Sequence, residues 1–196
     1  MAKGPQFERD MCKQLSLWWS DGARSDVFWR TSGSGARATV RAKKGKETFG
    51  QCGDVAAIHP DGVSFLEVFA IELKRGYNTS TPMDLIDINR KGLLLWEVWL
   101  WKVISEMNTH HRQGWMIIHK RDSRQPVVWI DARSCSRLKL NTSRTEGVFV
   151  RADIRWPTMV DKKMVPGIRT SVGMKGIPFD WFVDNVSPLD IRAMLF

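Results

Sequence analysis

The sequence predicts a three-layer α/β fold, in which a mixed central β-sheet lies between layers of helices. Three features indicate this fold: an amphipathic helical pattern near the N-terminus, several short apolar runs bounded by turn residues, and a wide apolar helical stripe in the middle of the chain. A chain of 196 residues has the length of one domain. We therefore expect one domain over residues 1–196, with its core over 3–135 and a C-terminal extension over 136–196.

The first predicted element is a helix that begins near Phe7. Apolar residues recur at helical spacing as far as Trp19, and Gly22 can end the helix. Residues 27–29 then indicate a short strand. The loop that follows holds two glycines, which permit a close backbone approach or a positive φ.

Two further apolar segments, residues 55–58 and 69–74, have the composition of strands. The turn residues Pro60, Asp61 and Gly62 lie between them. We therefore expect the two strands to pair as a hairpin.

A long helical region is predicted over residues 82–108. Thr81, Pro82 and Asp84 form a capping arrangement at its start. Its apolar stripe is unusually wide and includes Trp96 and Trp99. So wide a face is either buried in the core or part of a subunit interface.

The second half of the chain contains two clear strand patterns, residues 115–119 and 127–130, which would extend the central sheet. The pattern then weakens to a short strand at 148–150 and a loop-rich stretch with several glycines. A last helix is predicted from the capping arrangement of Ser187 and Asp190.

The charge balance favours a nucleic-acid partner. The formal net charge is +9, and basic side chains gain affinity for polyanions by displacing counterions from phosphates. The segment over residues 37–46 is densely basic and has little to bury. Its candidate DNA contacts are Arg37, Arg41, Lys43 and Lys44. We favour a DNA-facing role for this segment over a solvated basic arm.

Several other classes of protein are excluded. The longest apolar stretch, residues 93–104, is interrupted by charges and falls short of the ~20 residues needed to cross a bilayer. The N-terminus lacks the apolar core of a secretory signal, so we expect a cytoplasmic protein. Cys12, Cys52 and Cys135 are scattered and odd in number, which argues against a disulfide framework or a zinc site. No Walker A spacing is present, so we expect no nucleotide cofactor.

Glu72 and Lys74 project from the same face of their predicted strand, because they are two residues apart. Charges on a buried strand need a partner or a metal. Asp54 can be that partner, depending on the loop: a tight turn places it opposite Glu67, whereas a wider loop over residues 59–67 places it opposite Glu72. We adopt the wider loop, because that register brings Asp54, Glu72 and Lys74 to one face.

A cluster of this composition suits phosphodiester hydrolysis. The carboxylates of Asp54 and Glu72 can bind Mg²⁺ through oxygen, and the backbone carbonyl of Leu73 could complete the metal shell. Lys74 can position the attacking water or help to deprotonate it. The alternative is that the three side chains form no more than a surface salt bridge.

The order of these motifs resembles that of the PD-(D/E)XK nucleases, and within them the archaeal-type Holliday junction resolvases and related phage-encoded nucleases. Residues 3–9 resemble the opening of that family's first helix, and residues 30–35 resemble the loop after its first strand. Residues 53–55 and 71–74 resemble the two halves of the family signature. The resemblance covers about residues 3–130, and the tail after residue 135 lies outside the family's core.

Two features depart from the family pattern. Gly53 stands where a proline usually precedes the first aspartate, and the loop before Glu72 is longer than in the minimal resolvases. Both departures weaken the specific expectation of junction resolution more than the expectation of nuclease chemistry.

The resemblance implies a restriction-endonuclease-like fold and a Mg²⁺-dependent site in which Mn²⁺ can substitute. It further implies that Glu8 reaches the metal site and that Ser34 lies near the scissile phosphate. We add Arg30 and Arg75, which adjoin these motifs, to the candidate DNA contacts. Cleavage of both strands requires two sites, so we expect a homodimer.

We therefore expect a metal-dependent endodeoxyribonuclease that selects branched DNA such as a Holliday junction. One alternative is a sequence-specific restriction-type endonuclease, whose base-reading residues the C-terminal third could hold. The other is a DNA-binding protein that has lost catalysis, and the intact Asp54, Glu72 and Lys74 disfavour it.

Overall fold

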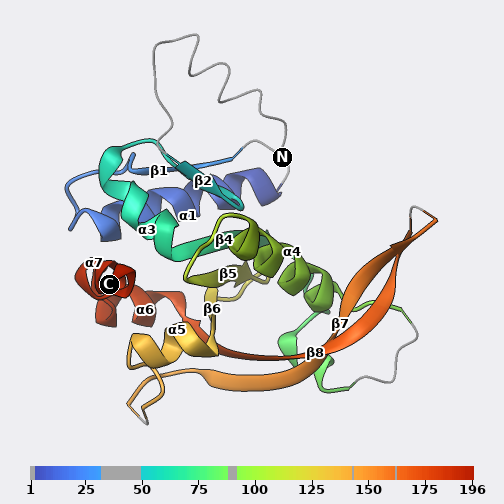
Figure 1. Ribbon diagram of the computed structural model, residues 1–196. Helices are drawn as coiled ribbons and strands as arrows, with labels where there is room; N and C mark the ends of the chain where they lie inside the picture. The colour runs from blue at the N-terminus through green and yellow to red at the C-terminus, as the bar shows by residue number, and fades with distance from the viewer. Residues whose placement is uncertain (1–2, 32–49, 88–91, 143, 162) are drawn as a thin grey trace.

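A five-stranded mixed sheet organises the computed structural model, with the strand order β4-β5-β6-β8-β7 (Figure 1). Strand β4 (Phe69–Arg75) runs parallel to β5 (Gly114–Lys120). The other three strands, β6 (Val127–Asp131), β7 (Val148–Val160) and β8 (Lys163–Pro178), are antiparallel to their neighbours. The structure describes residues 3–31, 50–87, 92–142, 144–161 and 163–196. The predicted α/β class with a mixed central sheet is confirmed.

A small antiparallel sheet adjoins the free edge of β4. It consists of β1 (Phe28–Arg30), β2 (Gly50–Cys52) and β3 (Val55–Ala57), in the order β1-β3-β2. One isolated parallel bridge, between Gly53 and Ile71, connects the turn before β3 to β4. The two sheets therefore meet at Gly53 and Ile71, directly before the candidate catalytic residues Asp54 and Glu72.

The predicted hairpin of residues 55–58 with 69–74 is wrong. The 3-10 turn η1 (Pro60–Gly62) and the helix α3 (Val63–Val68) separate the two strands, and β3 pairs with β1 and β2 instead of β4. The physical reason lies in Phe65, Leu66 and Val68, which are all buried. In a strand, the neighbours Phe65 and Leu66 would point to opposite faces. In a helix, side chains one and three residues apart can lie on the same side and pack against the core together.

One face of the main sheet is covered by α1 together with several short helices. Helix α1 (Lys3–Trp19) packs there with α3, α5 (Ala132–Arg137), α6 (Phe179–Asn185), α7 (Pro188–Arg192) and the short η3 (Ala193–Leu195). Phe65 is the centre of an aromatic cluster, with ring centroids of Trp19, Phe28 and Phe69 5.0, 5.2 and 5.9 Å away. Edge-to-face and tilted contacts of this kind stabilise a core beyond the area they bury.

The opposite face is covered by α4 (Leu95–Thr109). The predicted helical region over 82–108 therefore consists of two elements, since residues 82–85 form the short 3-10 turn η2 (Pro82–Leu85). Trp96 and Trp99 are 0% and 5% exposed and pack against the sheet, so of the two alternatives for this wide apolar face, burial in the core is the one that the structure shows. No helix in the described part of the chain is long and apolar enough to cross a membrane.

The loop predicted for the C-terminal third is also wrong. Strands β7 and β8 are continuous over most of residues 148–178 and form a curved ribbon (Figure 1). Val150, Ala152 and Ile154 of β7 pack in one cluster with α4, and the hairpin end of the ribbon extends beyond the helices. The glycines that suggested a loop have packing roles: a Cβ on Gly176 would lie 2.5 Å from the ring of Trp129. The predicted last helix is confirmed as α7, with the Ser187 and Asp190 capping box at its start.

A buried ion pair joins α4 to β7. The Glu97 carboxylate, 1% exposed, accepts hydrogen bonds from the backbone N–H of Arg155 at 2.8 Å and from its Nε at 2.9 Å. Arg155 Nη2 lies 2.7 Å from Glu97 Oε2 and donates to the carbonyl of Gly92 at 2.7 Å. These bonds hold the pKa of Glu97 below its usual value despite burial, which acts in the opposite direction.

We predict that Arg155→Met lowers the free energy of unfolding by about 3–5 kcal/mol, because it leaves the Glu97 carboxylate buried without its partner. Urea denaturation followed by tryptophan fluorescence measures the change. The matched control is Arg151→Met on the same strand, where the side chain is exposed and an effect within about 0.5 kcal/mol is expected. Equal stability of the two variants would contradict the prediction.

Candidate active site

The structure brings Asp54, Glu72 and Lys74 into direct contact. The Lys74 ammonium donates to Asp54 Oδ2 at 3.2 Å and forms a short ion pair with Glu72 Oε2. The Glu72 side chain is 0% exposed, whereas those of Asp54 and Lys74 remain partly open. The three side chains therefore form a charged cluster with one fully buried member.

Hydrogen bonds between residue 54 and β4, and not the predicted hairpin, bring Asp54 beside Glu72 and Lys74. The N–H of Asp54 donates to the carbonyl of Ile71 at 2.7 Å, and the N–H of Leu73 donates to Asp54 Oδ2 at 2.9 Å. The Asp54 side chain thus takes the place of a neighbouring strand along the edge of β4. Glu72 and Lys74 lie on the α4 face of β4, while Ile71 and Leu73 belong to the core on the other face.

Helix α4 contributes two charged residues that the sequence prediction missed. Lys102 Nζ lies 2.5 Å from Glu72 Oε1 and 3.6 Å from Asp54 Oδ1. One turn further along, Glu106 Oε2 accepts the N–H of Gly53 at 2.7 Å. The available signal was that Lys102 interrupts an otherwise apolar helical face, but spacing alone does not show which strand such a residue faces.

The two carboxyl groups have opposite pKa shifts. Burial acts to raise the pKa of Asp54, but the charges of Lys74 and Lys102 and the hydrogen bond from Leu73 outweigh it, so the pKa lies below its usual value. Burial and the nearby charge of Asp54 raise the pKa of Glu72 despite both lysines. Two acids at close range whose environments separate their pKa values are typical of functional sites.

Glu8 and Arg30 lie beside this cluster and pair with each other. Arg30 Nε is 2.8 Å from Glu8 Oε2, across α1 and β1. The thiol of Cys12 lies near Glu8, Asp54 and Arg30; burial first, and then the two acids, raise its pKa to about 12. Among the described residues, Glu8 forms no ion pair or hydrogen bond with Asp54 or Glu72.

The other predicted site residues divide into two groups. Arg75, at the end of β4, has its Nε 3.7 Å from Asp122 Oδ1. The remaining candidates lie outside the described residues: Ser34, Arg37, Arg41, Lys43 and Lys44.

The cluster has the chemistry of a divalent-cation site. No group of three or more His, Cys, Asp or Glu residues lies close enough for metal binding in the part of the chain that the structure describes, so the cluster offers the carboxylates of Asp54 and Glu72 as its side-chain ligands for a metal ion. Glu72 Oε1 is buried and receives no hydrogen bond of good geometry, although the Lys102 ammonium is close to it. Carboxylate oxygens are hard ligands, so two carboxylates that converge in this way could bind one Mg²⁺ or Mn²⁺ ion between them.

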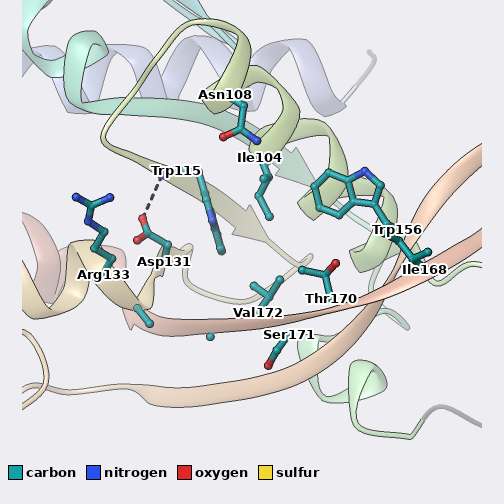
Figure 2. A pocket seen from close by; sticks show the side chains of 12 residues that line it. Ile104, Asn108, Trp115, Asp131, Arg133, Trp156, Ile168, Thr170, Ser171 and Val172 are labelled. Atoms are coloured by element: carbon teal, nitrogen blue, oxygen red, sulfur yellow. Dashed lines mark hydrogen bonds between the residues drawn. The ribbon is translucent and has the colours of Figure 1, made fainter.

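A pocket of about 510 Å³ lies elsewhere, between the end of α4 and β8 (Figure 2). Ile104, Trp115 and Val172 form apolar parts of its lining. The carboxylate of Asp131 at its edge already accepts the N–H groups of Trp115 and Ser134, at 3.1 and 2.9 Å. None of the acidic cluster lines this pocket, so it is separate from the candidate active site.

Comparison with known proteins identifies the class. The family described as "Phage putative PDDEXK endonuclease" matches residues 1–163. The chain belongs to this family. The expected membership of the PD-(D/E)XK superfamily and its phage connection are thereby confirmed, and the family description is that of an endonuclease. No curated protein and no solved structure shows a significant match.

The fold explains why this PD-(D/E)XK chain has Gly53 in place of the usual proline. Gly53 has φ +73°, whereas proline is restricted to φ near −65°. Its N–H, which proline lacks, donates to Glu106. A Cβ at this position would lie 2.1 Å from the carbonyl oxygen of Ile71. The glycine therefore permits the close approach that places Asp54 beside β4.

We predict that Gly53→Ala destabilises the protein and abolishes cleavage, because the methyl group must push residues 53–54 away from Ile71. Gly76→Ala is the matched control: Gly76 also has a positive φ of +84°, but nothing lies within 4 Å of its Cβ position. In the control, the free energy of unfolding measured with heat or urea should fall by about 1 kcal/mol, which is the cost of the positive φ alone. Gly53→Ala should cost clearly more, and an equal cost in both variants would refute the role assigned to this contact.

Proposed function

We propose that the protein is a metal-dependent endodeoxyribonuclease whose catalytic core is Asp54, Glu72 and Lys74. The observation that carries the proposal is the contact of these three side chains at the edge of β4, in a chain of the PDDEXK endonuclease family. Their residue types and their spacing match the requirements of phosphodiester hydrolysis.

Asp54 and Glu72 would hold Mg²⁺, with Mn²⁺ as a substitute, and the carbonyl of Leu73 is a third candidate ligand. When bound, the ion stabilises the negative charge that develops on the phosphate. The N–H of Leu73 fixes the Asp54 carboxylate, so the ligand is oriented before any ion or substrate arrives.

Lys74 is the candidate for handling the attacking water. Its ammonium contacts both carboxylates, which hold the side chain in one direction. In this position the ammonium would orient the attacking water, and only the neutral amine form could accept the proton that the water loses. The family resemblance adds Glu8, on α1 next to the cluster, and Ser34 as further members of the site.

DNA binding is assigned to the basic residues around the site. Arg30 and Arg75 lie at its borders on β1 and β4, and Arg37, Arg41, Lys43 and Lys44 follow β1 in the sequence. Their charge supplies the affinity for phosphates that is independent of sequence. We further propose a homodimer, since cutting both strands of a duplex or junction requires two such sites.

Branched DNA, such as a Holliday junction, is the proposed preferred substrate, on the basis of the family resemblance. A second candidate is a restriction-type endonuclease that reads base sequence, and one observation favours it. The hairpin end of the β7–β8 ribbon is a two-stranded element that extends beyond the helices (Figure 1), and ribbons of this form fit the major groove. Faster cleavage of four-way junctions than of linear duplexes supports the first candidate, and the reverse supports the second.

We predict that Glu72→Ala and Lys74→Ala each reduce cleavage by at least about 10²-fold, because each removes a group that acts on the metal or the water. The assay incubates each variant with a panel of branched and linear DNAs plus Mg²⁺ and quantifies the products on gels. DNA binding, measured by gel shift, should be largely retained, with circular dichroism as the folding control. Loss of binding in both variants would indicate a structural role, and no cleavage of any DNA by the wild type with Mg²⁺ or Mn²⁺ would support an inactive DNA-binding protein.

A further inference from the structure

Lys102 forms an ion-pair bridge between the two acids of the site. Its Nζ lies 2.5 Å from Glu72 Oε1 and 3.6 Å from Asp54 Oδ1. Lys74 contacts the other two oxygens, Glu72 Oε2 and Asp54 Oδ2. The two lysines thus divide the four carboxylate oxygens between them, and Lys102 holds the pair that Leu73 and Lys74 leave free.

The charge of the cluster is balanced as it stands. Asp54 and Glu72 are matched in number by Lys74 and Lys102, and a fully buried acid such as Glu72 is costly without a cationic partner. A divalent ion held between the two acids would bring a third and a fourth positive charge to the same oxygens. Like charges at such short separation repel strongly, so one lysine has to leave.

The structure indicates which lysine can leave. The Lys102 side chain is 43% exposed and reaches the acids from α4, so its flexible stem can turn into solvent. Lys74 is 16% exposed and lies on the same strand as Glu72, between both carboxylates. The helix itself can stay in place, because Glu106 binds the N–H of Gly53 independently of the Lys102 ammonium.

We propose that Lys102 is a built-in counter-ion, which occupies the position of the catalytic cation between Asp54 and Glu72 until a divalent metal displaces it. This inference rests on the proposed function, since it takes the two acids to be the metal site. Helix α4 thereby takes part in the site, because its Lys102 ammonium holds the two acids together before a metal ion binds. The same ammonium then competes with the metal ion for the same oxygens.

The test measures Mn²⁺ binding to the full chain by calorimetry and thermal unfolding with and without Mn²⁺. Lys102→Met should bind Mn²⁺ about 5-fold more tightly than the wild type or better, because its competitor is gone. In EDTA the variant should unfold at a lower temperature, because Glu72 has lost a partner. Saturating Mn²⁺ should remove most of this difference, since the ion then pairs with the acids in both proteins.

Two variants control for charge and structure. Lys102→Arg keeps the positive charge and should remain near the wild type in EDTA and in Mn²⁺ affinity. Lys120→Met, at the end of the neighbouring strand β5, removes the same charge without touching either acid and should leave Mn²⁺ affinity unchanged.

Two results would overturn the inference: unchanged or weaker Mn²⁺ binding by Lys102→Met, or a loss of stability that persists in saturating Mn²⁺. Either would make Lys102 a permanent structural partner of Glu72. Failure of the proposed function has a different signature, namely wild-type Mn²⁺ binding that is absent or that survives in Glu72→Gln. That result would remove the metal site itself and the role of Lys102 with it.

Discussion

The contact between residues 53–54 and the edge of β4 is the constraint on which the site depends. The parallel bridge between Gly53 and Ile71, with its hydrogen bond from the Asp54 N–H, and the bond from the Leu73 N–H to the Asp54 carboxylate join the small sheet to the large one. Both contacts require the close approach that Gly53 allows. The geometry of the candidate site therefore depends first on these contacts of residues 53–54 with β4, and the ion pairs with the lysines add to it.

The charged side chains then add a second level of organisation. Each buried or half-buried acid on the α4 side has a specific cationic or N–H partner: Glu72 with two lysines, Glu97 with Arg155, and Glu106 with the N–H of Gly53. Unpaired, such groups would cost several kcal/mol each, of the order of the net stability of a domain. Helix α4 is thus fixed in position by electrostatics at its first turn and at its last, and by the buried side chains of Trp99, Leu100 and Val103 in between.

Sequence reasoning found what depends on local pattern and missed what depends on long-range pairing. Glu72 and Lys74 were recognised because residues two apart on a strand share a face, and their partner Asp54 was correctly grouped with them. The route was wrong, since residues 63–68 form a helix and β4 pairs with a strand 45 residues later in the register Phe69 with Gly114. Lys102 could not be assigned, because its role depends on the face that α4 turns to the sheet.

The position of β4 at the outer edge of the five-stranded sheet has a consequence for experiments on this enzyme class. Exposed strand edges invite pairing with other molecules, and proteins protect them with covering groups or charge. Here the bridge from Gly53 to Ile71 covers one part of this edge, and the Asp54 carboxylate accepts the N–H of Leu73, so one side chain is both a metal-ligand candidate and a cover of the strand edge. An alanine at this position loses both functions together, whereas an asparagine keeps an oxygen to accept the N–H and reveals the chemical contribution by itself.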